Sequence, residues 1–225
     1  MTQPVAAPAD ISRPRYLETP QPLVFPSEEF VPETQLHLEL RTLLYLLLKD
    51  YLGLTATVCS EQFVYYAAND PKQCLAPDVF VRLVPPDEDI VVWKTWERGA
   101  PDVAVEIASH SDTPELPWQE KLVRYACLGA KQVVRFDPKA KEGSRLRIWD
   151  RVSERLAERE VVGDRAASGV LNVTWVAAAT GARPVTLRIA TDELGKELVL
   201  THAEARQLAE TRIRELEEEL KRRGG

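Results

Sequence analysis

The sequence predicts an α/β domain that is followed by a helix. Apolar residues recur at steps of three and four, as Leu36, Leu40, Leu43, Leu47 and Tyr51, which predicts an amphipathic helix that ends near Gly53. Between residues 55 and 190, several segments are rich in β-branched and aromatic residues and are separated by turn-forming residues, as strands are. From Thr201 to Arg223 the sequence is again strongly helical. We therefore expect helices packed with strands, and a terminal helix after them.

Length and composition indicate one compact domain with tails. The chain has 225 residues, of which 44% are hydrophobic, enough to bury one core. Residues 1–26 contain six prolines, so we expect an irregular arm there, a domain over 27–190 and a helical tail over 191–225. No apolar run approaches the roughly 20 residues of a membrane span, and the first 20 residues lack secretory-signal features. We therefore expect a cytoplasmic protein without membrane partners.

Charge and cysteine content limit the classes of binding site. The net charge of −6 gives no overall attraction to nucleic acid, so DNA binding would need a local basic surface around an acidic centre. Cys59, Cys74 and Cys127 are odd in number, far apart and without the paired spacing of a zinc site. We expect them to be reduced thiols.

Further elements are predicted between the first helix and the tail. Two β-rich stretches, 55–67 and 75–84, are separated by turn-forming residues, so we expect a β-hairpin. Residues 91–93 fit a short strand or a lid, and the pattern does not choose between them. More strands are expected at 102–108, 132–136 and 146–149, and a helix that Gly129 ends follows the first of them. The pairing of the strand-forming pieces over 161–190 stays open.

Two of the expected strands open with Pro-Asp, at Asp78 and Asp102. A carboxylate among buried apolar residues is costly unless it has a partner, so these positions favour a functional interpretation. Side-chain alternation places Asp102, Ala104 and Glu106 on one face of their strand. Asp78 and Glu106, on neighbouring strands, could hold a hard divalent cation such as Mg²⁺, which prefers oxygen ligands.

Lys121 lies on one stripe of the helix before Gly129, together with Trp118 and Tyr125. Near Glu106, its ammonium would orient or deprotonate a metal-bound water, or offset charge on a reacting phosphate. The same residues also fit a structural interpretation, in which Pro-Asp begins a strand and Glu106 forms an ordinary ion pair with Lys121.

The order of these motifs resembles the Uma-two family of restriction endonucleases, which belongs to the PD-(D/E)XK nuclease superfamily. The resemblance rests on Pro77-Asp78-Val79, on residues 101–109 and on Lys121 with the residues after it as far as Pro138. It covers residues 33–138 well and extends more loosely to residue 190. It implies a restriction-endonuclease-like mixed central sheet flanked by helices, with DNA as the substrate and Mg²⁺ or Mn²⁺ as the cofactor. Its implied catalytic residues are Asp78, Glu106 and Lys121, of which Asp78 and Glu106 hold the metal.

The chain also departs from the family pattern. The superfamily's usual lysine, two residues after the glutamate, is replaced by Ala108, and the resemblance implies that Lys121 substitutes for it. Glu39 on the first helix either matches an accessory acidic position of the family or is an exposed glutamate. Asp102 either assists metal binding or caps the start of its strand. Where the family commonly has Ser-Pro-Ser-Thr, this chain has residues 109–112 as Ser-His-Ser-Asp. The alternative to an active endonuclease is therefore a catalytically inactive nuclease-fold binding or assembly module.

The terminal helix has two interpretations. Thr201 and Glu204 have the spacing of a capping box, and a heptad-like apolar seam follows at Ala209, Ile213, Leu216 and Leu220. The helix is either solvated along its length or a dimerising or docking element. A homodimer formed through this helix is thus one of the expectations.

Overall fold

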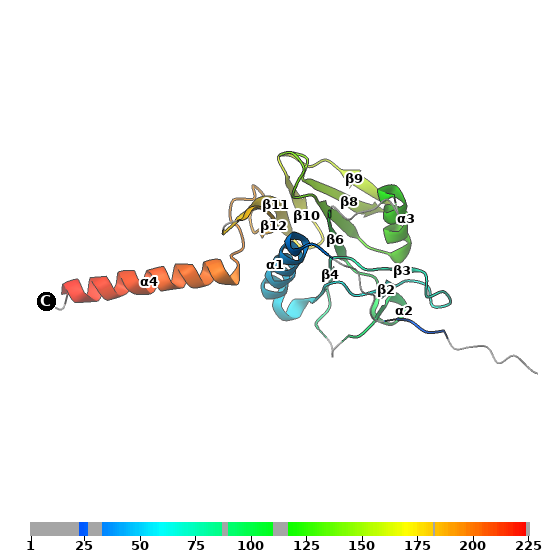
Figure 1. Ribbon diagram of the computed structural model, residues 1–225, viewed down its shortest axis with the longest axis horizontal. Helices are drawn as coiled ribbons and strands as arrows, with labels where there is room; N and C mark the ends of the chain where they lie inside the picture. Colours follow the sequence, from blue (N-terminus) through cyan, green and yellow to red (C-terminus); the bar gives the residue numbers. More distant parts are fainter. Residues whose placement is uncertain (1–22, 27–32, 87–89, 110–116, 182, 224–225) are drawn as a thin grey trace, which may run out of the picture.

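The computed structural model describes residues 23–26, 33–86, 90–109, 117–181 and 183–223. They form a mixed α/β domain from which one long helix projects (Figure 1). The central sheet has six strands in the order β1-β4-β6-β7-β8-β9, and only β6 and β7 among them run parallel. The strands are β1 (Thr57–Cys59), β4 (Val79–Arg82), β6 (Val103–Ile107), β7 (Gln132–Phe136), β8 (Leu146–Val152) and β9 (Arg155–Arg159). The predicted mixed central sheet is confirmed.

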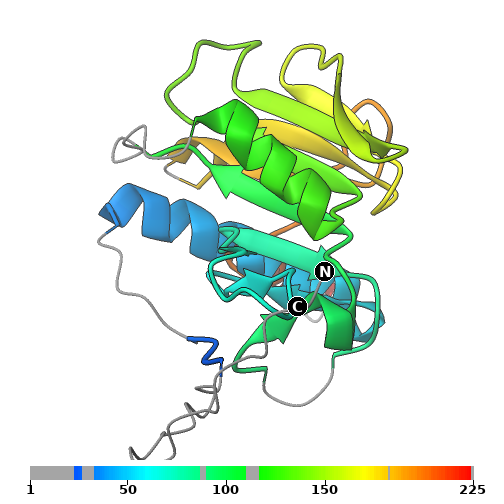
Figure 2. The ribbon, with the colours of Figure 1, turned by 90° about the vertical axis from the view of Figure 1, so that its right-hand side faces the viewer.

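Helices α1 (Gln35–Leu52) and α3 (Trp118–Leu128) cover opposite sides of this sheet, and Figure 2 shows α3 lying across the strands on the near side. The alternation of β6 explains the arrangement. Val103, Val105 and Ile107 pack into one core with the leucines of α1, whereas Ala104 packs into a second core with the buried residues of α3. Along β6, the side chain of Glu106 points to the opposite face from Val105 and Ile107. It therefore lies on the α3 side with Ala104, the residue with which the sequence predicted that it shares a face.

A second sheet completes the core on the α1 side. It is an antiparallel meander of β10 (Arg165–Ser168), β11 (Val173–Thr180) and β12 (Arg183–Ala190). Its buried residues Trp175, Leu187 and Ile189 belong to the same apolar cluster as Leu44 and Val105. The strand-forming pieces over 161–190, whose pairing the sequence left open, therefore cover one face of the domain.

The expected hairpin over residues 55–84 forms, but its two arms are divided between two sheets. At its base, β1 pairs with β4 in the central sheet, and nearer its tip β2 (Val64–Tyr65) pairs with β3 (Cys74–Leu75). The latter pair forms a small sheet with β5 (Trp93–Lys94), which runs parallel to β2. Trp93 therefore belongs to a strand, the first of the two alternatives for residues 91–93. Two short helical turns, η1 (Gly53–Thr55) and α2 (Thr95–Arg98), complete this region.

The expected N-terminal arm lies mostly outside the described residues, which begin at residue 23. Its last residues touch the domain. The ring of Phe25 lies 5.2 Å from that of Tyr65 and 5.6 Å from that of Trp96, centroid to centroid, and Tyr65 Oη donates to the carbonyl of Pro26. Aromatic contacts thus fix the chain just before the domain begins.

The terminal helix α4 (His202–Arg223) begins at the predicted capping box. Thr201 N donates to Glu204 Oε2 at 2.8 Å, and Glu204 N donates to Thr201 Oγ1 at 3.3 Å. The Glu204 carboxylate also accepts two hydrogen bonds from the guanidinium of Arg188, a side chain that is 1% exposed. The first turn of α4 is therefore tied to β12. Among the described helices, none is both long and apolar enough to span a membrane.

We expect Glu204→Ala to lower the free energy of unfolding by about 2 kcal/mol, because it leaves the buried Arg188 charge without its carboxylate partner and removes the helix cap. Urea denaturation followed by circular dichroism measures this change. The matched control is Glu210→Ala on the exposed part of the same helix, which should change stability by no more than about 0.5 kcal/mol. Equal effects of the two substitutions would contradict an anchoring role for Glu204.

Candidate active site

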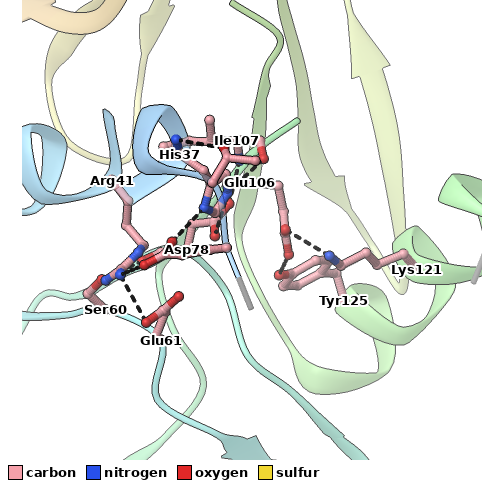
Figure 3. A network of polar contacts seen from close by, with 11 residues as sticks. His37, Arg41, Ser60, Glu61, Asp78, Glu106, Ile107, Lys121 and Tyr125 are labelled. Atoms are coloured by element: carbon pink, nitrogen blue, oxygen red, sulfur yellow. Dashed lines mark hydrogen bonds and ion pairs between the residues drawn. The ribbon is translucent and has the colours of Figure 1, made fainter. Parts of the chain in front are cut away.

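The candidate site lies where β4 begins and β6 ends, between the first turns of α1 and α3 (Figure 3). The register of these antiparallel strands pairs Val79 with Val105. Asp78 immediately precedes Val79 and Glu106 follows Val105, so the next step of the register sets the two acidic residues opposite each other. Asp78 is fixed there, because the backbone N–H of Ile107 donates to its Oδ2 at 2.6 Å. The structure therefore brings Asp78 and Glu106 to the same end of the sheet.

Lys121 reaches Glu106 from α3. Its Nζ lies 2.7 Å from Glu106 Oε2, and Tyr125, one turn further along the helix, donates its hydroxyl to Glu106 Oε1. Burial raises the pKa of Glu106, the Lys121 ammonium opposes that rise, and the neighbouring Asp78 carboxylate adds to it. A buried glutamate is thus held between one cation and one hydroxyl, and its pKa also responds to the charge of Asp78.

His37 is the partner of Asp78 that the sequence interpretation did not assign to the site. Its Nε2 lies 3.2 Å from Asp78 Oδ1 and 3.1 Å from the Ile107 carbonyl, and its Nδ1 lies 2.9 Å from Glu33 Oε2. The hydrogen bond to Asp78 raises the pKa of His37 to about 9 despite the opposing effect of burial. His37 therefore carries a positive charge at neutral pH and offsets the charge of Asp78.

A chain of polar contacts supports His37 and returns to Asp78. Glu33 accepts from Arg41 Nη2 at 2.7 Å, Arg41 Nη1 donates to Ser60 Oγ at 3.0 Å, and Ser60 Oγ donates to the Asp78 carbonyl at 2.7 Å. Arg41 also forms an ion pair with Glu61 at 3.0 Å. The spacing of Glu33, His37 and Arg41, four residues apart along one helical face, is a sequence signal that could have identified this network.

The two accessory candidates lie elsewhere. Glu39 forms an ion pair with Arg183 of β12 and accepts from Gln35, so the structure does not bring it to Asp78. Asp102 is at the opposite end of β6 from Glu106, four residues or about 13 Å away along the strand. Asp102 was expected either to assist metal binding or to cap the start of its strand, and its position favours the cap.

The contacts of Asp102 are those of a buried structural carboxylate. It accepts from the Leu83 N–H at 2.6 Å and forms ion pairs with Lys131 at 2.7 Å and Arg82 at 3.1 Å, and its side chain is fully buried. Burial by itself raises the pKa of Asp102, but hydrogen bonds from Lys131 and Leu83 bring it below its usual value. Asp102 is therefore charged and fully partnered at neutral pH.

Comparison with known proteins places this arrangement in a family. A family model, Uma2, described as "Putative restriction endonuclease", matches residues 27–177, more than half of the chain. The chain belongs to the Uma2 family. The family predicted from the order of the sequence motifs is thereby confirmed.

One solved structure similar to this Uma2 protein is described as a "putative nuclease belonging to DUF820" from Anabaena variabilis ATCC 29413. The two chains are 13% identical, and the alignment covers 63% of this chain and 74% of the other with a TM-score of 0.46. No curated protein matches this chain.

The donor atoms of this Uma2 site fit a hard divalent cation. Within the described ranges, no group of three or more His, Cys, Asp and Glu side chains has a metal-binding arrangement. Asp78 and Glu106 nevertheless offer carboxylate oxygens only, and the Asp78 charge is one cause of the raised pKa of Glu106, a repulsion that a cation would relieve. Two carboxylates leave several coordination positions for water, which is the coordination that Mg²⁺ favours.

We expect the stability of the metal-free protein to fall as the pH rises from about 6.5 to about 9. The pKa of His37 is 6.5 in an unfolded chain and about 9 in the fold, so its contribution is complete below the lower value and is lost through the higher one. The loss should be at most about 2 kcal/mol, because solvent partly screens the pair. Urea denaturation at a series of pH values measures it. His37→Gln should flatten this part of the profile, and an unchanged slope would contradict the assignment.

We expect Asp102→Asn to lower the free energy of unfolding by about 3 kcal/mol, because it leaves the Arg82 and Lys131 charges without their buried partner. The matched control is Asp50→Asn, which removes a carboxylate that is 41% exposed and forms an ion pair with His202, and which should change stability by no more than about 0.5 kcal/mol. Isothermal titration of the folded Asp102→Asn protein with Mg²⁺ should give the wild-type affinity. A loss of Mg²⁺ binding would show that Asp102 assists the metal after all.

Proposed function

We propose that this Uma2 protein is a divalent-metal-dependent endonuclease that hydrolyses phosphodiester bonds in DNA. The observation that carries the proposal is the contact between Lys121 and Glu106 at the end of the sheet where Asp78 begins β4. Ala108 occupies the superfamily's usual lysine position, yet a lysine from α3 supplies an ammonium at the site. The contact of the lysine with the glutamate, beside the strand that the aspartate precedes, supports this assignment of the nuclease motif.

Asp78 and Glu106 would hold the cation, Mg²⁺ or Mn²⁺. When bound, such a cation polarises a phosphodiester and lowers the pKa of a coordinated water, so that hydroxide is available near neutral pH. Asp78 is oriented for this role by the Ile107 N–H and by His37, and Glu106 by the Tyr125 hydroxyl. The two ligands are thus preorganised by contacts on both faces of the sheet.

Lys121 would act on the phosphate and on the attacking water. Its side chain is 28% exposed, and its Nζ contacts Glu106 Oε2. At that position it can hydrogen-bond the water and offset the negative charge that builds on the phosphate oxygens during attack. Truncating it should therefore slow hydrolysis more than it weakens metal binding.

Two cations close to Glu106 support DNA as the substrate. Arg135 of β7 is the registered neighbour of Glu106 on β6, and its guanidinium lies 4.7 Å from the ring centre of Trp118 at the start of α3. Together with Lys121 it places two cations beside the acidic pair, as the net charge of −6 requires of a DNA-binding site in this chain. Contacts of this kind bind the phosphate backbone and carry no sequence preference by themselves.

We expect purified protein to cut supercoiled and linear DNA only when Mg²⁺ or Mn²⁺ is added, and Glu106→Ala and Lys121→Ala each to reduce the rate by at least about 100-fold. Gel assays of initial rates measure this. The controls are Glu160→Ala and Lys196→Ala, which change residues distant in sequence from Asp78, Glu106 and Lys121. Both variants should cut DNA at the wild-type rate. Thermal unfolding verifies that each variant is folded.

The same assay separates the two functional interpretations. Mg²⁺ titration of the wild type and Glu106→Ala reports binding without turnover. Metal binding that depends on Glu106 without DNA cleavage would favour another phosphate-containing substrate. Neither binding nor cleavage would favour the inactive binding or assembly module.

A further inference from the structure

The projecting helix α4 exposes an apolar seam that no part of the described chain covers. Ile213, Leu216 and Leu220 are 55%, 43% and 70% exposed, and α4 contains no buried residue (Figure 1). With Ala209 they follow alternating steps of four and three, which are the d, a, d and a positions of a heptad repeat. Such a seam normally faces a partner helix.

The base of α4 holds the seam in a fixed position. Arg188, which is 1% exposed, binds Glu204 and also donates to the carbonyl of Val199 at 2.6 Å. These contacts fix the first turn of α4 against β12. The helix therefore leaves the domain as a directed arm, because its first turn is anchored by a buried ion pair and its remaining turns contact solvent.

Arg206 occupies the a position between Ala209 and the base of α4, and an apolar groove lies on the domain beside that base. The groove has a volume of about 570 Å³ and is lined by the outer leucines of α1, including Leu38 and Leu46, and by the first residues of α4. Leu38 and Leu46 are 44% and 43% exposed. His202 lines the groove and, counted back from Ala209, occupies the preceding d position. A partner helix on the seam would thus bring its own domain toward this groove.

We propose that α4 pairs in parallel with α4 of a second copy of this chain, and that the groove beside α1 lies at the edge of the resulting dimer interface. Ile213 at an a position and Leu216 at a d position are the combination that favours two parallel strands. The inference is independent of the nuclease activity, since it rests on the exposed seam and on the charges that flank it.

The flanking charges select the parallel orientation. Arg212 is a g position and Glu217 is the e position that follows, so in a parallel pair Arg212 faces Glu217 of the partner subunit, twice by symmetry. In an antiparallel pair, e positions face each other and g positions face each other, so Glu210 would lie opposite Glu217 of the partner subunit and Arg212 opposite Glu219 of the partner subunit. The repulsive and attractive pairs then offset each other, whereas the parallel arrangement has only the two attractive pairs.

Sedimentation equilibrium of the full chain over about a hundredfold range of concentration tests association. We expect a mass at high concentration of twice the 25.4 kDa of one chain. Leu216→Glu should shift the distribution to the monomer, because it places like charges in the seam. The control is Glu218→Gln, an f position that points away from the partner, and it should behave like the wild type. A wild type that stays monomeric, or a dimer that survives Leu216→Glu, would overturn the proposal.

Disulfide trapping tests the orientation. Residues at d face d in a parallel pair, so Leu216→Cys should form a cross-linked dimer on mild oxidation, well above the background of the wild type, whose Cys127 is exposed. Glu218→Cys should remain at that background. A dimer in which Leu216→Cys gives only background cross-linking would overturn the parallel arrangement, since a faces d in an antiparallel pair. At a concentration at which the wild type is monomeric, both variants should keep the wild-type unfolding transition, because both positions are exposed in the single chain.

Discussion

The antiparallel pairing of β4 with β6 is the constraint on which the candidate site depends. Asp78 and Glu106 are 28 positions apart in the sequence, and only the register that pairs Val79 with Val105 sets them opposite each other. A slip of one residue would move every side chain of the strand to the other face and would place a carboxylate among the leucines of α1. The apolar alternation that builds the two cores therefore also fixes the geometry of the acidic pair.

Two neighbouring carboxylates at the end of a buried strand are unstable without positive partners, and each helix supplies one. His37 of α1 offsets the charge of Asp78, and Lys121 of α3 offsets that of Glu106. The pKa of His37 rises to about 9 for this reason, while burial and the nearby Asp78 raise the pKa of Glu106 against the influence of Lys121. The site is thus an electrostatic balance between elements on both faces of the sheet, which packing alone would not produce.

The sequence predicted the residues whose positions follow from periodicity and missed those that depend on how an element is rotated or where it ends. Strand alternation placed Glu106 correctly, and the helical stripe of α3 aimed Lys121 at it. The same alternation could not show that Asp102, at the start of its strand, is paired with Lys131 and Arg82. Glu39 was chosen over His37, although two residues on a helix point about 200° apart, so that only one of them can face the site. That rotation is set by the buried leucines of α1.

In the proposed function, a lysine carried by a helix would make the chemistry depend on helix packing rather than on the strand that bears the glutamate. Lys121 is held at Glu106 because its neighbours Leu122 and Tyr125 are buried against the sheet. With Ala104 beneath α3, the strand offers a small side chain at the contact, and the helix can approach closely enough for Tyr125 and Lys121 to share one carboxylate. In the proposed site, Ala108 at the superfamily's usual lysine position would therefore be compatible with a complete set of charges, because Lys121 supplies the cation from an element whose rotation is fixed by the same core.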